Sequence, residues 1–200
     1  FAGFYLEDGK RIAEVKLGGF PHEAILSPDG RLLCVSDNGV LWMTDEGDGG
    51  NTISILDVGR MRKTGEINLG RFRRPHGLAG DGARMRLLGT TEKPDRLLLV
   101  DPVAQKVLRD YDVHGKGPHM VSLGPGGDWA YVSNTDSGAV AAVELKTGAV
   151  ELIRTGARPQ GSALAPGGKR LYVANSGADS VTIIDPLTRK AIGVIPTGKS

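Results

Sequence analysis

The 200-residue sequence predicts an all-β fold built from repeated four-stranded antiparallel units, and three observations support this. The first is a recurring pair of proline with histidine or glutamine, whose copies begin 54, 43 and 41 residues apart. These pairs are Pro21-His22, Pro75-His76, Pro118-His119 and Pro159-Gln160. The second is that a turn and then a short apolar run follow each pair at a fixed distance. The third is the glycine content of 30 residues, about twice the usual frequency, which is typical of many short elements separated by turns.

Each repeat contains stretches that are typical of strands, because they are rich in β-branched residues and alternate apolar with polar positions. The first stretch covers residues 24–26 in one repeat and 121–123 in another. The second covers 32–35, 87–88, 129–132 and 171–173. The third covers 52–56, 97–100, 140–143 and 181–184, and the fourth covers 66–69, 107–113, 150–153 and 191–195. Four strands in roughly 41 residues is the spacing of β-propeller blades.

The repeat boundaries predict a single, partial β-propeller domain over residues 1–200, with about four and a half blades. The predicted units are a half blade at 1–20 and repeats at 21–74, 75–117, 118–158 and 159–200. The first repeat is longer, and we place an insertion at 38–51. Residues 1–20 match only the third and fourth strands of a unit, so we expect a fragment of a larger ring, with seven blades as one candidate size.

Short motifs within the second strands carry a resemblance to a known family. Tyr-Val-Ser-Asn at 131–134, Tyr-Val-Ala-Asn at 172–175, the Pro-His openings and Pro-Asp-Gly at 28–30 resemble the YVTN-type β-propeller repeat family. More distantly, the pattern is similar to lactonase-type seven-bladed propellers. This resemblance implies a binding or scaffold protein of the periplasm or cell surface, with lactone hydrolysis or a haem or copper centre in other relatives. The second repeat departs from the pattern at Thr91, and the fourth has Gln160 in place of histidine.

Composition excludes several other classes. The net charge of +2 argues against a nucleic-acid partner recognised by bulk charge. The one cysteine, Cys34, excludes a disulfide framework and a multi-cysteine metal site, and we expect it to be buried within a strand. No apolar run is long enough for a membrane span. No Ser-His-Asp nucleophile pattern or phosphate-binding loop is visible.

Candidate ligand residues gather on one face of the predicted fold. In an antiparallel four-stranded unit, the start of the first strand and the end of the second lie at the same edge. His22, His76, His119 and Gln160 should therefore converge at one mouth of the channel, together with the polar residues that end the second strands. Further candidates on that face are Arg74, Lys116, Arg158 and Trp42. Arginine and lysine favour an anionic ligand there.

The same residues admit other interpretations. The histidines can serve as turn and packing residues, contact a ligand, or ligate a metal, although we expect separate blades to hold them too far apart to share one ion. Residues 37, 91, 134 and 175 are expected to form turns by bonding their own backbone. Trp42 and Met43 are expected to fold back onto a blade, with capping of a ligand as the alternative.

We therefore favour a non-enzymatic binding or scaffold propeller, whose partner is a small anionic ligand or a protein, over two alternatives. One alternative is a lactonase-like hydrolase of an anionic sugar lactone, with His22, His76, His119 or Glu23 as the acid or base. The other is a redox propeller with haem or copper. No cofactor and no metal ligand are predicted, and the expected location is the periplasm, the cell surface or the extracellular space.

Overall fold

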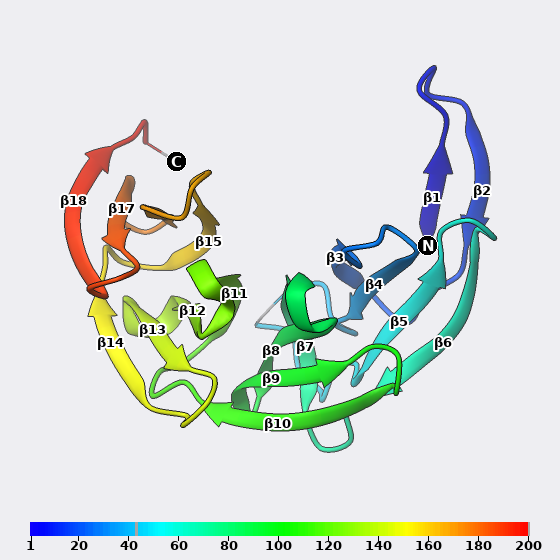
Figure 1. The fold of residues 1–200 in the computed structure, drawn as a ribbon, viewed down its shortest axis with the longest axis horizontal. Helices are drawn as coiled ribbons and strands as arrows, with labels where there is room; N and C mark the ends of the chain where they lie inside the picture. The colour runs from blue at the N-terminus through cyan, green and yellow to red at the C-terminus, as the bar shows by residue number, and fades with distance from the viewer. Residues whose placement is uncertain (43, 200) are drawn as a thin grey trace.

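The computed structural model describes residues 1–42 and 44–199, so Met43 lies outside the described residues. It contains four four-stranded antiparallel sheets and one two-stranded sheet, which follow one another along an arc (Figure 1). The helices among the described residues are three-residue turns, η1 (Gly82–Arg84), η2 (Pro125–Gly127) and η3 (Thr135–Ser137). The all-β propeller fold predicted from the repeats is confirmed.

Each sheet is a meander in which consecutive strands pair. The two-stranded sheet holds β1 (Ala2–Tyr5) and β2 (Arg11–Val15). Blade 1 holds β3 (Pro21–Leu26), β4 (Leu32–Asp37), β5 (Thr52–Asp57) and β6 (Arg62–Asn68). Blade 2 holds β7 (Arg73–Asp81), β8 (Arg86–Lys93), β9 (Asp95–Asp101) and β10 (Lys106–Asp112). Blade 3 holds β11 (Pro118–Leu123), β12 (Trp129–Asn134), β13 (Ala139–Glu144) and β14 (Val150–Arg154). Blade 4 holds β15 (Pro159–Leu164), β16 (Leu171–Asn175), β17 (Ser180–Asp185) and β18 (Lys190–Pro196).

The register of the first two strands is the same in every blade. The proline that opens each repeat pairs with the residue predicted to end the second strand, as in Pro21 opposite Asp37 and Pro118 opposite Asn134. The other two blades pair Pro75 with Thr91 and Pro159 with Asn175. The first strands β3, β7, β11 and β15 lie on the inner side of the arc (Figure 1). Their opening residues therefore share one edge and face the centre of the fold.

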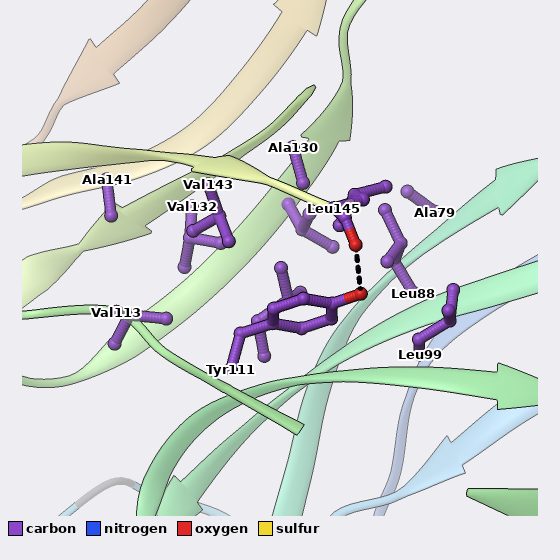
Figure 2. Packing of buried hydrophobic residues seen from close by; sticks show 12 residues of the cluster. Ala79, Leu88, Leu99, Tyr111, Val113, Ala130, Val132, Ala141, Val143 and Leu145 are labelled. Carbon is purple, nitrogen blue, oxygen red and sulfur yellow. Dashed lines mark hydrogen bonds between the residues drawn. The ribbon is translucent and has the colours of Figure 1, made fainter. Parts of the chain in front are cut away.

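One apolar cluster fills each interface between neighbouring sheets. Between blades 2 and 3 it includes Leu88, Leu99, Val132 and Val143, from strands of both blades (Figure 2). Figure 2 also shows the buried Tyr111 hydroxyl donating to the carbonyl of Leu145, at 2.8 Å. Similar clusters join blade 1 to blade 2 and blade 3 to blade 4, and a smaller one joins the two-stranded sheet to blade 1. Burying these side chains, each contributing about 1.5–3 kcal/mol, holds the blades face to face.

Two local expectations have different outcomes. Cys34 lies inside β4 and is 3% exposed, as predicted, and burial raises the pKa of its thiol to about 11. The residues that end the second strands are buried. The Thr91 hydroxyl donates to the carbonyl of Pro94 and so bonds its own turn as expected, whereas the side chains of the other three residues bond neighbouring segments. Asp37, for example, accepts hydrogen bonds from the Gly18 amide and from the Ser54 hydroxyl. The expectation that it bonds its own turn is wrong, because the adjacent strand and loop offer donors within reach.

Candidate ligand pocket at the inner edge of the blades

A cavity of about 320 Å³ lies where the first strands of the four blades converge, a size at the small end of the range for ligand sites. Most of the ligand residues predicted from the sequence line it. The lining residues are His22, Asn38, Leu41, Trp42, Thr44, His76, Glu92, His119, Arg158 and Gln160. They come from all four blades and from the insertion between β4 and β5.

A β-bulge aims the histidines into this cavity. In every blade the register between the first and second strands shifts just after the opening proline, and the shift in blade 2 falls between Pro75 and Leu78. His22, His76, His119 and Gln160 all lie within these shifts. Bulges bend a strand and re-aim its side chains, and they are frequent beside binding sites. The repeated bulge explains why four equivalent side chains leave the sheets and meet.

The backbone before each bulge is equally regular. The residue that precedes the proline has a left-handed φ in every blade: 43° at Phe20, 54° at Arg74, 63° at Gly117 and 52° at Arg158. For residues other than glycine this conformation costs on the order of 1–3 kcal/mol, and the surrounding structure must impose it. The turn into each first strand is therefore a fixed part of the blade and sets the direction in which the bulge begins.

Neighbouring first strands approach each other closely. A Cβ atom at Gly77 would lie 2.5 Å from the carbonyl oxygen of His119, so only glycine permits this approach of β7 to β11. The Ser36 hydroxyl donates to the carbonyl of His76 at 2.8 Å, and the Thr90 hydroxyl donates to the carbonyl of His119 at 2.6 Å. These bonds fix each histidine against the preceding blade.

The three imidazole rings consequently form one cluster. The ring centroids of His22 and His76 are 3.7 Å apart, and those of His76 and His119 are 3.9 Å apart. The expectation that separate blades hold them too far apart is wrong, because the close approach of the first strands was not visible in the sequence. Within the described part of the chain, no group of three or more His, Cys, Asp or Glu side chains is arranged to hold a metal ion.

Burial keeps the inner imidazoles neutral. Burial, followed by the charges of His119 and His22, lowers the pKa of His76 to about 2. Burial, followed by the charges of His22 and Arg158, lowers the pKa of His119 to about 4. The Nδ1 atoms of His76 and His119 are buried without a hydrogen-bond partner among the described residues. Each of these two imidazoles therefore has one ring nitrogen whose hydrogen-bonding capacity the described residues leave unused.

Glu92 is the charged pocket residue that the sequence reasoning missed, and the other lining residues not predicted there are Asn38, Leu41 and Thr44. Its side chain is 7% exposed, and burial raises the pKa of the carboxyl to about 7, against the opposing effect of Arg74. The Oε1 atom is buried and lacks a hydrogen-bond partner within the described ranges. One signal was available: Glu92 follows Thr91 at the position that Asn38, Thr135 and Ser176 occupy in the other repeats, so it is charged where they are neutral.

The insertion forms one wall of the pocket and is held in a defined shape. The Asp45 carboxylate accepts hydrogen bonds from the backbone amides of Leu41 and Trp42, at 3.0 and 2.8 Å. Arg74 donates to the backbone carbonyls of Asp45 and Gly47, so a blade 2 side chain holds the loop of blade 1. Trp42 is 66% exposed and lines the cavity, so the expectation that it folds back onto a blade is wrong.

The basic residues predicted for the rim divide into three environments. Arg74 is 1% exposed and lies under the insertion, where it pairs with Glu92. Lys116 lies in a separate groove of about 490 Å³ and pairs with Asp95 at 3.2 Å. Arg158 occupies the position equivalent to Arg74, but the loop beside it is short, and its exposed side chain lines the cavity. No acidic side chain of the described chain pairs with Arg158.

Glu23, predicted as an alternative acid or base, is not among the cavity's lining residues.

Comparison with known proteins supports the fold. No protein-family model matches the chain, and no curated protein matches it. Among solved structures, hydrazine synthase of Kuenenia stuttgartiensis is similar with a TM-score of 0.76 and 21% identity, over 98% of this chain and 54% of that chain. The Cps50 (Swd1) β-propeller domain of Myceliophteria thermophila is similar with a TM-score of 0.75 and 14% identity, over 94% of this chain and 59% of that chain.

The chain thus spans between half and two thirds of the length of these two structures. At 21% and 14% identity the likeness concerns the fold, because one fold supports many unrelated functions. Among the described residues, no helix has the length and apolar character needed to cross a membrane. The arc of four-stranded antiparallel blades and its structural neighbours identify the chain as a β-propeller.

Proposed function

We propose that the chain is a binding propeller of the YVTN type, whose cavity at the inner edge of the blades takes a small anionic ligand. The observation that carries the proposal is the exposed Arg158 side chain, which faces the cavity and has no acidic partner among the described residues. Arg74, the other arginine predicted for this site, is buried and engaged by Glu92 at 3.8 Å and by the carbonyls of Asp45 and Gly47. An anion would therefore meet one uncompensated positive charge.

The rest of the lining supports the same ligand class. Neutral imidazoles and the amides of Asn38 and Gln160 supply hydrogen-bond donors without adding negative charge. The guanidinium of Arg158 can bind a carboxylate or phosphate through two parallel hydrogen bonds. The exposed Trp42 and Leu41 side chains form an apolar wall that suits a ligand with an apolar face.

The test is a binding titration of the 200-residue protein with benzoate and with inorganic phosphate, which represent the two anion classes. Arg158→Ala should weaken binding roughly ten- to a hundredfold, the value of a hydrogen bond to a charged group. Two control variants should bind normally. Lys116→Ala removes a cation that is already paired with Asp95, and Arg170→Ala removes an exposed cation outside the cavity lining. Added salt should weaken binding by screening. Unchanged affinity in Arg158→Ala would contradict the proposal.

A hydrolase is the second candidate function, and Glu92 is the observation that favours it. A buried carboxyl with a pKa near 7 beside neutral imidazoles has the properties of a general acid or base. This replaces Glu23 of the sequence-based hypothesis. Hydrolysis of a sugar lactone that is lost in Glu92→Gln, and retained in Glu23→Gln, would support it.

A further inference from the structure

We propose that the cavity takes up its anion together with a proton, which is held on the imidazole of His119 or on the carboxyl of Glu92. The inference rests on the proposed function, because it concerns the same cavity and the same class of ligand. It adds a property that a purely electrostatic anion site lacks: when the anion binds, the protein takes up one proton from the solution.

The geometry places protonatable atoms without partners around one cavity. The Nδ1 atoms of His76 and His119 and the Oε1 atom of Glu92 are buried, and none has a hydrogen-bond partner among the described residues. All three side chains line the cavity. A buried polar atom without a partner costs on the order of 1–3 kcal/mol, so a ligand that satisfies these atoms recovers that energy.

The charged and titratable groups around these atoms come from several strands. His22 on β3, His76 on β7 and Arg158 before β15 face His119. Four charged residues act on Glu92: Arg74 on β7, Asp95 at the start of β9, Asp136 in the neighbouring blade and Lys93 at the end of β8. No acidic side chain contributes to the pKa of His119 or His76. Glu92 is the acidic residue in the cavity lining, and it is not among the groups that shift the pKa of either imidazole, so the protein itself supplies no counter-charge that holds a proton on them.

An anion at Arg158 supplies that counter-charge and also removes a repulsion. Arg158 is one of the groups that lower the pKa of His119, because two positive charges would lie near each other. An anion that pairs with Arg158 cancels this repulsion and offers an acceptor to a protonated imidazole. The pKa of His119 therefore rises on binding, and the same negative charge raises the pKa of Glu92 further.

Thermodynamic linkage fixes the sign of the pH dependence. A group whose pKa is higher in the complex than in the free protein takes up a proton, and the affinity for the anion falls as pH rises between the two pKa values. One coupled proton changes the affinity by up to about tenfold per pH unit. Because the free pKa values of His119 and Glu92 are about 4 and about 7, the affinity falls with rising pH from about pH 4 upward if His119 holds the proton and from about pH 7 upward if Glu92 does. Titrations between about pH 6 and about pH 8 compare the two groups.

The experiment is calorimetric titration of the 200-residue protein with benzoate, which stays ionised across this range, in two cationic buffers of different ionisation enthalpy. The difference in observed enthalpy gives the number of protons taken up. We expect net uptake in the wild type, a smaller uptake in His119→Gln and in Glu92→Gln, and none in the double variant. Glu23→Gln is the matched control, since this carboxyl is not a lining residue. Far-ultraviolet circular dichroism and thermal melts establish that each variant is folded.

The outcomes separate the two proposals. Benzoate binding that needs Arg158 but proceeds without proton uptake overturns the coupling and leaves the binding function standing. Proton uptake that persists in a folded double variant also overturns the coupling, because the proton then resides elsewhere. A failure of both benzoate and phosphate to bind the wild type overturns the proposed function, and the coupling with it.

Discussion

The Glu92 carboxylate lies 3.8 Å from the Arg74 guanidinium, and the two side chains are 7% and 2% exposed. Arg74 also holds the carbonyls of Asp45 and Gly47 in the insertion. One buried ion pair therefore joins the pocket's acidic group to the loop that forms the pocket wall. Burial nevertheless dominates over the pairing, since the pKa of Glu92 is raised to about 7.

The first prediction concerns the stability of the protein between about pH 5 and about pH 7.5. The pKa of Glu92 is about 7 in the folded protein, against an ordinary value of 4.5 for the unfolded chain, so the folded protein binds more protons than the unfolded chain in this window. The stability that this carboxyl contributes is therefore lost as pH rises, and the loss is complete once the pH is above the folded pKa of about 7. Glu92→Gln should lack this loss, which amounts to roughly 3 kcal/mol at about 1.4 kcal/mol per pKa unit.

Urea unfolding of wild type and Glu92→Gln at several pH values measures the effect. The comparison uses the change with pH, because the substitution also removes the ion pair between Arg74 and residue 92 at every pH. Glu66→Gln, an exposed carboxyl paired with Lys63, is the control and should follow the wild type. Parallel curves for wild type and Glu92→Gln would contradict the raised pKa.

The second prediction concerns acid sensitivity at His76. Burial lowers its pKa from 6.5 to about 2, so the unfolded state binds more protons below pH 6.5 and stability falls as the solution becomes more acidic. His76→Gln should remove this contribution, which reaches about 3 kcal/mol near pH 4. Unfolding curves at pH 7 and near pH 4 measure it. His114→Gln, which replaces an exposed histidine outside the cavity lining, should keep the wild-type acid sensitivity; an equal effect of both variants would show that the cluster is not the cause.

The sequence was informative about the blades because their signals are local. The proline-histidine spacing and strand alternation place His22, His76 and His119 at one edge, and the structure has them there. The distance between the rings depends on how neighbouring blades pack. Gly77 permits this close packing, but the reason for a glycine there is visible only when the His119 carbonyl is seen to lie beside it.

The roles of individual charged residues were less predictable from the sequence. Arg74 and Arg158 hold equivalent positions in their repeats, so the repeat pattern predicts the same role for both. They differ because the insertion covers Arg74 and supplies carbonyl acceptors, whereas Arg158 is left exposed at the cavity. The raised pKa of Glu92 likewise results from burial produced by chain segments that are distant in sequence. Such environments follow from tertiary packing rather than from local pattern.

The third prediction tests a hydrogen bond between blades 3 and 4. The buried Tyr131 hydroxyl donates to the Pro186 carbonyl at 2.6 Å, and burial raises its pKa to about 12. Tyr131→Phe leaves that carbonyl unsatisfied and should lower the free energy of unfolding by about 1–2 kcal/mol. Tyr172 holds the equivalent position in blade 4 and is 38% exposed, so Tyr172→Phe is the matched control and should change stability by less than about 0.5 kcal/mol. Thermal melts of both variants compare the two sites, and equal melting temperatures would argue against the bond.

The last prediction concerns Trp42, whose exposed ring is held beside the cavity by the bond from its amide to Asp45. An exposed side chain contributes little to folding, so Trp42→Ala should leave stability within about 0.5 kcal/mol of the wild type. If the ring packs against a bound ligand, the same variant should bind benzoate about two- to tenfold more weakly, the usual worth of an aromatic contact.

Tryptophan emission distinguishes this site from the second tryptophan. The Cζ atom of Arg189 lies over the Trp129 ring, 4.3 Å from the ring centroid. Trp129 is not among the residues that line the cavity. In Trp129→Phe, benzoate should still change the emission of Trp42, whereas in Trp42→Phe the emission of Trp129 should stay constant. A ligand-dependent signal that follows Trp129, or an unchanged affinity in a folded Trp42→Ala variant, would place the ligand away from the insertion. The cavity wall formed by Leu41, Trp42 and Thr44 would then have no part in recognition.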